Sequence, residues 1–263
     1  MAISHIGPVA AANISAFGGV SKASISAING VTASFGGGGD PGGGSLPTVR
    51  GVGTNVIGTG AITPGLPTGT AENDILVLFL VTNNQAITVS GWTECDSSPQ
   101  SDATDGIRLT VFWKRAGASE SAPTTSDSGT YQIGQIIGIV GGFRDGSPFD
   151  SNNGGTAGSS VNTMTIPGPT TTNANCLVLA CAAINHNGDF DAWFSGWTNA
   201  NLGSITEQMD QTKTSGAGAG GGFGVITGTK ATTGAVGNTT STLTGGNTRR
   251  AVYWSGAIKP TGL

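Results

Sequence analysis

Much of the chain alternates between apolar runs and polar or glycine-rich segments. Every position of 75–81 is apolar, and the same holds for 177–179. A run that is apolar on both faces is typical of a strand buried on both sides. We therefore predict that these two segments are central strands of β-sheets.

Two further segments alternate with a period of two, which is the period of a strand. In 107–115 the odd positions are mainly apolar, whereas Arg108, Thr110 and Lys114 fall on the opposite face. This pattern predicts a half-exposed strand. Residues 252–254 alternate in a similar way and predict a last strand that docks beside the others.

The order of these segments repeats within the chain. The string SGWT occurs at 90–93 and again at 195–198, and each copy follows an apolar strand and precedes two further predicted strands. Such a repeat predicts two similar half-units closed on one core. The expected fold class is therefore all-β: an antiparallel, jelly-roll-like β-sandwich in two similar halves, with Trp92 and Trp197 capping its ends.

An eleven-residue pattern occurs three times in succession near the start of the sequence, with copies that begin at Ile3, Ile14 and Ile25. Each copy places Ile-Ser first, an apolar residue three positions later, a turn-forming pair, and then Val. A unit this short cannot bury its own apolar side chains, so it needs neighbouring copies or another protein as a partner. The assembly positions predicted from this pattern are Ile3, Ile6, Val9, Ile14, Phe17, Val20, Ile25, Ile28 and Val31.

The third copy carries the strongest hairpin signal. Its pair Asn29-Gly30 is preferred in tight two-residue turns, and β-forming residues flank the pair on both sides. The sequence leaves open whether the strands of the repeat pair within one chain or between chains.

A glycine-rich stretch separates this repeat from the rest of the chain. Residues 36–45 offer few side chains that could pack, as a flexible linker requires. We therefore divide the chain into an extended N-terminal repeat arm (1–35), a linker (36–45) and a sandwich body (46–263).

Composition supports the all-β prediction and argues against several functions. Only 10% of the 263 residues are charged, 46 are glycine, and helix-forming Glu, Lys and Gln are scarce. The net charge of −4 comes without a basic stripe, so nucleic acid is not an expected partner. The first residues lack a signal-peptide pattern, and no apolar run approaches the roughly 20 residues of a membrane helix, so neither export nor membrane insertion is expected.

Three cysteines are an odd number. Cys176 and Cys181 stand five residues apart, which puts them on opposite faces of one strand. Together with Cys95 they are expected to be buried free thiols rather than disulfide partners.

Catalytic chemistry is not expected, because the chain holds only two histidines, His5 in the arm and His186 in the body. Neither a His-rich zinc site nor a Ser-His-acid triad can be assembled from these parts, and no cofactor is expected. Asp189 and Asp191 could offer oxygen ligands to calcium. A turn held by Asn and Asp side chains is the favoured interpretation there, as it is for a predicted loop at 145–155.

Aromatic residues near His186 suggest a surface for binding. Exposed aromatic rings can stack on sugars or on another protein, and equally they can anchor a long loop to the core. The sequence leaves both interpretations open. The candidate surface-binding loop consists of His186, Asp189, Phe190, Asp191, Trp193 and Phe194.

Taken together, arm and body resemble a class of tailed-bacteriophage virion proteins. The matching strings are SKASISAINGV at 21–31 and, spread over 72–150, ENDILVLFL, SGWTE, TVFWKRAGASESAPT and GSPFD. The resemblance implies β-sandwich modules on the outside of virions, as capsid decoration or as fibre and tail components, often trimeric. It brings no catalytic residues with it.

Two functions follow as expectations. In the first, a non-enzymatic structural protein made in the host cytoplasm is attached through its arm to a major capsid or tail protein, and it decorates or cements the virion. In the second, a tail or fibre protein binds host-surface glycan through loops such as 185–199. A homo-oligomer is expected in both, with a trimer favoured.

Overall fold

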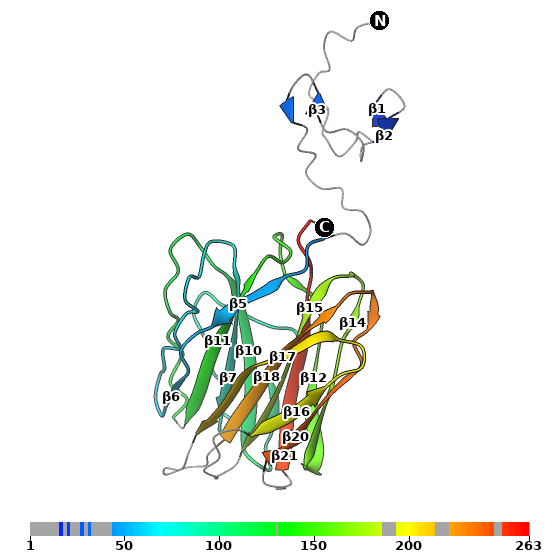
Figure 1. Cartoon of the computed structure of the whole chain (residues 1–263). Helices are drawn as coiled ribbons and strands as arrows, with labels where there is room; N and C mark the ends of the chain where they lie inside the picture. Colours follow the sequence, from blue (N-terminus) through cyan, green and yellow to red (C-terminus); the bar gives the residue numbers. More distant parts are fainter. Residues whose placement is uncertain are drawn as a thin grey trace, which may run out of the picture.

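The fold is all-β, as predicted (Figure 1). In this computed structural model, each half of the body forms one large antiparallel sheet, and the two sheets pack against each other. The residues that the structure describes are 16–17, 20–21, 27–28, 31–32, 44–129, 131–185, 193–213, 221–244 and 249–262.

The first sheet is built from residues 48–140 in the spatial order β5-β11-β7-β10-β8. Along β11, β6 continues the edge that β5 begins, and β9 pairs with β10 next to β8. The strands are β5 (Thr48–Val52), β6 (Val56–Gly58), β7 (Ile75–Thr82), β8 (Thr93–Glu94), β9 (Gln100–Asp102), β10 (Ile107–Arg115) and β11 (Gln132–Val140).

The second sheet has the spatial order β12-β21-β15-β18-β17. Its strands are β12 (Phe149–Val161), β15 (Cys176–Asn185), β17 (Gly203–Lys213), β18 (Gly221–Lys230) and β21 (Arg249–Ile258). A small sheet, β13-β20-β16, and a short pair, β14-β19, accompany it. These strands are β13 (Thr163–Pro167), β14 (Thr170–Thr171), β16 (Phe194–Thr198), β19 (Gly234–Ala235) and β20 (Asn238–Leu243).

Both large sheets have the same topology, which confirms the predicted pair of similar halves. In each sheet the first strand of the half is an edge, the last strand lies beside it, and two middle strands follow. A strand that comes between those two middle strands in the chain forms the opposite edge, β8 in the first sheet and β17 in the second. Each half thus makes a sheet of its own.

The shared core draws side chains from the inner faces of both sheets. Phe79 of β7 meets Phe223 of β18 and Trp254 of β21, with ring centroids 6.4 and 6.1 Å apart. As predicted, β7 and β15 are central and buried on both faces. This core excludes water from aromatic and aliphatic side chains of both halves, so neither sheet can bury its inner face alone.

Similar strings in the two halves do not place the same positions on the same face. Aligning Asp74 with Asn175 sets Ile75 beside Cys176, yet Ile75 faces the shared core and Cys176 packs on the outer side. A shift of one residue exchanges the faces of a strand. Because both faces of β7 and β15 are apolar, either set of alternating side chains can face the shared core.

The outer face of each large sheet is covered as well, which corrects two predictions. Trp92 packs on the outer face of the first sheet and Trp197 on that of the second, so neither caps an end of the sandwich. On β10, Thr110 and Phe112 are buried although they lie on the outer face. Loop residues that include Ile62 cover this face, so β10 is more buried than its alternation suggests.

The predicted loop at 145–155 is also corrected, because β12 begins at Phe149. Asp150 stabilises a bend at Thr172 and Asn173, more than 20 residues further along the chain. Its carboxylate accepts hydrogen bonds from the backbone N–H and hydroxyl of Thr172, both at 2.6 Å, and from the backbone and side-chain N–H of Asn173 at 3.0 and 2.8 Å. Burial acts to raise the pKa of Asp150, but these hydrogen bonds outweigh burial and hold the pKa below its ordinary value.

Cys95, Cys176 and Cys181 are free and buried, as predicted. Burial raises the pKa of the Cys176 thiol to about 12 and that of Cys181 well above its ordinary value. Both therefore stay protonated and act as small apolar side chains.

Two short hairpins lie in the arm, each within one chain. β1 (Ala16–Phe17) pairs with β2 (Val20–Ser21), and β3 (Ala27–Ile28) pairs with β4 (Val31–Thr32). The second hairpin flanks Asn29-Gly30, as the turn signal predicts. Other assembly positions of the repeat, Ile3, Ile6, Val9, Ile14 and Ile25, lie outside the described residues.

Candidate functional site

Trp193 of the candidate surface-binding loop is not exposed at the surface. Trp193 is 1% exposed and Phe194 is 2% exposed, and both pack on the outer face of the second sheet. Phe194 stacks on Trp197, with ring centroids 5.6 Å apart. Their burial favours the second interpretation for Trp193 and Phe194, in which the two rings anchor the chain to the core. The other loop candidates, His186, Asp189, Phe190 and Asp191, lie outside the described residues.

Asp210 of β17 holds the backbone of Trp193 and Phe194 in place. Both its carboxylate oxygens accept a hydrogen bond from the backbone N–H of Trp193 at 3.0 Å, and one also accepts from the N–H of Phe194 at 2.9 Å. Burial raises the pKa of Asp210 to about 6, the two N–H groups oppose the rise, and Glu207 adds to it. The raised pKa thus belongs to a structural carboxyl group.

No cluster of three or more His, Cys, Asp or Glu side chains that could hold a metal ion occurs among the described residues. Within the same residues, no helix is long and apolar enough to cross a membrane.

The exposed large apolar side chains of the described residues gather at one edge of the first sheet. Val52 of β5 and Ile57 of β6 lie on the edge itself, Leu46 precedes β5, and Val140 ends the adjacent β11. Each is between 37% and 41% exposed. Because β5 and β6 pair only with β11, their other side offers backbone groups for pairing.

This β5–β6 edge is also where the arm joins the body. Ser45, the residue directly after Gly44, bridges to Thr261 near the C-terminus, and β5 starts three residues later. Arm, linker and apolar edge are therefore continuous along the chain.

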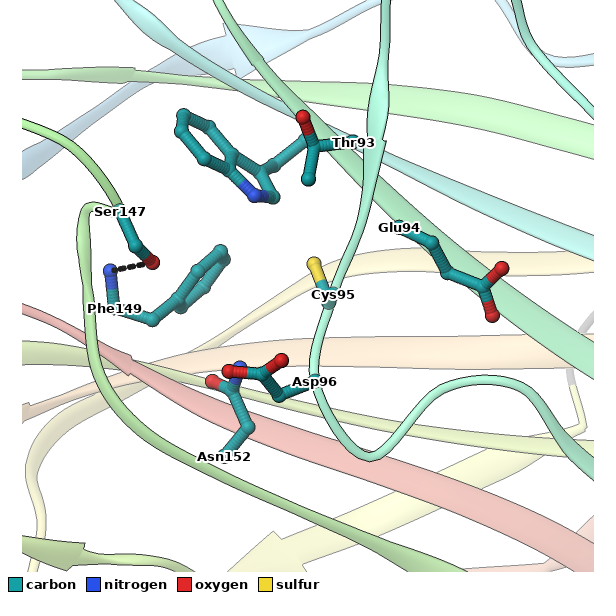
Figure 2. Close-up of a pocket in the computed structure, with 8 residues that line it drawn as sticks. Thr93, Glu94, Cys95, Asp96, Ser147, Phe149 and Asn152 are labelled. Carbon is teal, nitrogen blue, oxygen red and sulfur yellow. Dashed lines mark hydrogen bonds between the residues drawn. The ribbon is translucent and has the colours of Figure 1, made fainter.

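A second candidate is a recess between the two sheets, shown in Figure 2. Its cavity volume is about 110 Å³, and its lining comes from the segment around β8, from β10 and from the start of β12. Trp113 and Phe149 form its aromatic walls, with ring centroids 6.4 Å apart and planes at 82°. Cys95, Asp96 and Asn152 complete this part of the lining (Figure 2).

Neither the edge nor the recess was predicted from the sequence. The recess combines residues from both halves that are more than 30 positions apart, and no local motif marks such a meeting. Val52 and Ile57 lie in short strands interrupted by glycine and polar residues, so their pattern gives no sign of an exposed edge.

Comparison with models of known families, with curated proteins and with solved structures found no significant match to this chain.

Proposed function

We propose that the chain is a non-enzymatic structural protein of a tailed-phage virion. It is attached through its N-terminal arm and decorates or cements the outside of the particle, on the capsid or the tail. The observation that carries the proposal is the coincidence of two features at one place: the exposed apolar residues of the body gather on the β5–β6 edge, and the arm joins the body there.

An open sheet edge with exposed apolar side chains promotes association, and proteins normally protect such edges. Here Val52 and Ile57 stand on the open edge. The arm supplies β-forming hairpins of two-residue strands, which are too short to be stable alone. We assign the edge to the arm of a neighbouring copy, added as an extra strand, so that each subunit holds the next.

The resemblance of the arm and the first half of the body to phage virion proteins supports the same proposal. A body of low charge whose core is shared by two similar sheets suits a rigid exterior module. The partners proposed are the major capsid or tail protein and further copies of this chain, with a trimer favoured.

Deletion of residues 1–35 tests the attachment. We expect the truncated body to remain folded, by circular dichroism and thermal unfolding, but to be missing from purified particles. A truncated body that enters particles at normal occupancy contradicts the proposal. Locating the protein in images of the particle gives its position and copy number.

Substitution of the edge tests the role of the apolar side chains separately. Val52→Thr with Ile57→Thr keeps the β-propensity and removes apolar surface. We expect self-association, measured by sedimentation, to weaken at least tenfold, while Thr48→Ser on the same strand leaves it unchanged. Equal association of all three proteins contradicts the role of the edge.

The alternative is a tail or fibre adsorption protein that binds host-surface glycan. Burial of Trp193 and Phe194 removes two of the aromatic residues on which it depended. Binding of the purified chain to host cells, together with particles that stay robust without it, supports this alternative over the cement role.

A further inference from the structure

The two sheets contact each other along two of their edges, and each line of contact is called a seam. The internal repeat relates the strands of one seam to those of the other. Along one seam, β17 lies against β11. Asn55, between β5 and β6, donates a hydrogen bond from Nδ2 to Oε1 of Gln211 in β17 at 2.7 Å. Along the other seam, β12 and β21 lie against β9. Side chains bridge the second seam as well, since Arg250 of β21 donates a hydrogen bond to Asp102 of β9 at 3.3 Å, but this seam also retains the recess of about 110 Å³.

The walls of the recess are apolar and aromatic. Trp113 is only partly buried, so part of its indole borders the open space. Phe149 stands edge-on to Trp113 and also to Trp254 of the core, with ring centroids 5.6 Å apart in the latter pair. Burial raises the pKa of Cys95 well above its ordinary value, so this wall carries a neutral thiol.

The polar end of the recess offers hydrogen-bond acceptors. Asp96 is exposed, and Asn152, which also lines the recess, has a buried Oδ1 without a hydrogen-bond partner. Figure 2 also shows the side chain of Glu94 directed away from the recess. The lining contains no Lys, Arg or His, so the charge of Asp96 is not neutralised from within it.

The size of the recess limits its ligand. Pockets for whole small-molecule ligands usually enclose roughly 300–1,000 Å³. A recess of about 110 Å³ accommodates one protruding group, such as the end of a long side chain. An aromatic wall, a carboxylate and an unsatisfied acceptor together favour a flat cation with several N–H donors.

We propose that this recess is a docking pocket for an arginine side chain of a partner protein. The guanidinium lies against the indole of Trp113 and donates hydrogen bonds to Asp96 and Asn152. The methylene groups contact Phe149 and Cys95. Arginine fits better than lysine because its guanidinium is planar, weakly hydrated and rich in donors, and it is enriched among side chains that anchor protein interfaces. The inference concerns the body alone and goes beyond the virion assignment.

Titration of the full-length chain with Nα-acetyl-arginine amide tests the pocket. The readout is the indole N–H signal of Trp113 in a ¹⁵N–¹H spectrum, assigned by its absence in Trp113→Phe. We expect saturable binding with a dissociation constant in the millimolar range, because one side chain supplies only part of an interface. The neutral isostere Nα-acetyl-citrulline amide should bind at least tenfold more weakly.

Two isosteric variants at adjacent acidic positions make a matched pair. Asp96→Asn should weaken binding of the arginine probe at least fivefold, whereas Glu94→Gln should change it less than twofold because Glu94 points away. Asp96→Asn should leave the fold intact, since Trp254 Nε1 donates to the backbone oxygen of Asp96 and not to its side chain.

Three results overturn the proposal. The first is no saturable shift of the Trp113 signal with the arginine probe in a chain that remains folded. The second is equal binding of the citrulline probe, or equal loss in the Asp96 and Glu94 variants. The third is saturation of the same signal by glucose or N-acetylglucosamine without binding of arginine, which assigns the recess to a saccharide.

Discussion

The indole of Trp254 meets the ring of Phe79 edge-on across the interface between the two sheets, with centroids 6.1 Å apart and planes at 68°. Phe79 belongs to the central strand of the first half and Trp254 to the last strand of the second. The same indole donates a hydrogen bond from Nε1 to the backbone oxygen of Asp96 at 3.0 Å. Trp254 therefore joins the core to the segment that lines the recess.

Truncation of Trp254 should be among the most damaging single changes in the body. Trp254→Ala removes a fully buried indole and should lower the free energy of unfolding by about 3–5 kcal/mol. Trp254→Phe keeps an aromatic ring but leaves the oxygen of Asp96 without its donor, so it should cost less, about 1–3 kcal/mol. Denaturant unfolding measures both. Equal losses in the two variants would show that packing against Phe79 contributes little.

The aromatic residues that the sequence offered for binding should behave as core residues. Trp193→Ala and Phe194→Ala should each lower the free energy of unfolding by about 3–5 kcal/mol, because both side chains are buried. Any loss of binding in these variants should follow the loss of folded protein across a denaturant series. A stable, fully folded Trp193→Ala protein that loses only binding contradicts this prediction.

Sequence patterns predicted the strands better than the surfaces. Runs such as 75–81 and the repeated SGWT strings revealed central strands and two similar halves, because period and order are local or simply repeated features. The burial of Thr110 was not predictable, since it depends on loops that fold over β10. The recess needs Trp113 and Phe149 to meet across two sheets, and only the packing of the halves brings them together.

The buried carboxyl of Asp210 should make stability depend on pH in a distinctive direction. Its pKa is about 6 in the folded protein, against an ordinary value of 3.8. Below about pH 4 both folded and unfolded states are protonated, so its contribution is fully present. Between about pH 4 and 6 only the folded state holds the proton, so stability falls as pH rises, by about 3 kcal/mol in total.

Asp210→Asn should remove this fall, because an amide does not titrate and its oxygen, in the place of Oδ2, still accepts from the N–H groups of Trp193 and Phe194. Urea midpoints from pH 4 to 7.5 measure the difference between the two proteins. Asp145→Asn at an exposed position is the matched control and should keep the slope of the original protein. An unchanged slope in Asp210→Asn contradicts the raised pKa.

Gly224 of β18 should tolerate no side chain, because the stacked rings of Phe194 and Trp197 lie directly over it. A Cβ atom at Gly224 would stand 2.7 Å from Cδ2 of Phe194 and 2.9 Å from Cζ2 of Trp197, closer than real Cβ contacts. Gly224→Ala must therefore push the aromatic pair off the outer face, at a cost of about 1–3 kcal/mol.

Gly158 of β12 offers the matched control, because a Cβ there meets nothing within 4 Å and its backbone is not in the left-handed region. Gly158→Ala should leave stability unchanged or raise it by up to about 1 kcal/mol, since alanine restricts the unfolded chain. Thermal and denaturant unfolding of the two variants isolates the aromatic contact from the general effect of adding a methyl group to a strand. If both variants lose stability equally, β-strand geometry rather than the Phe194–Trp197 pair sets the need for glycine.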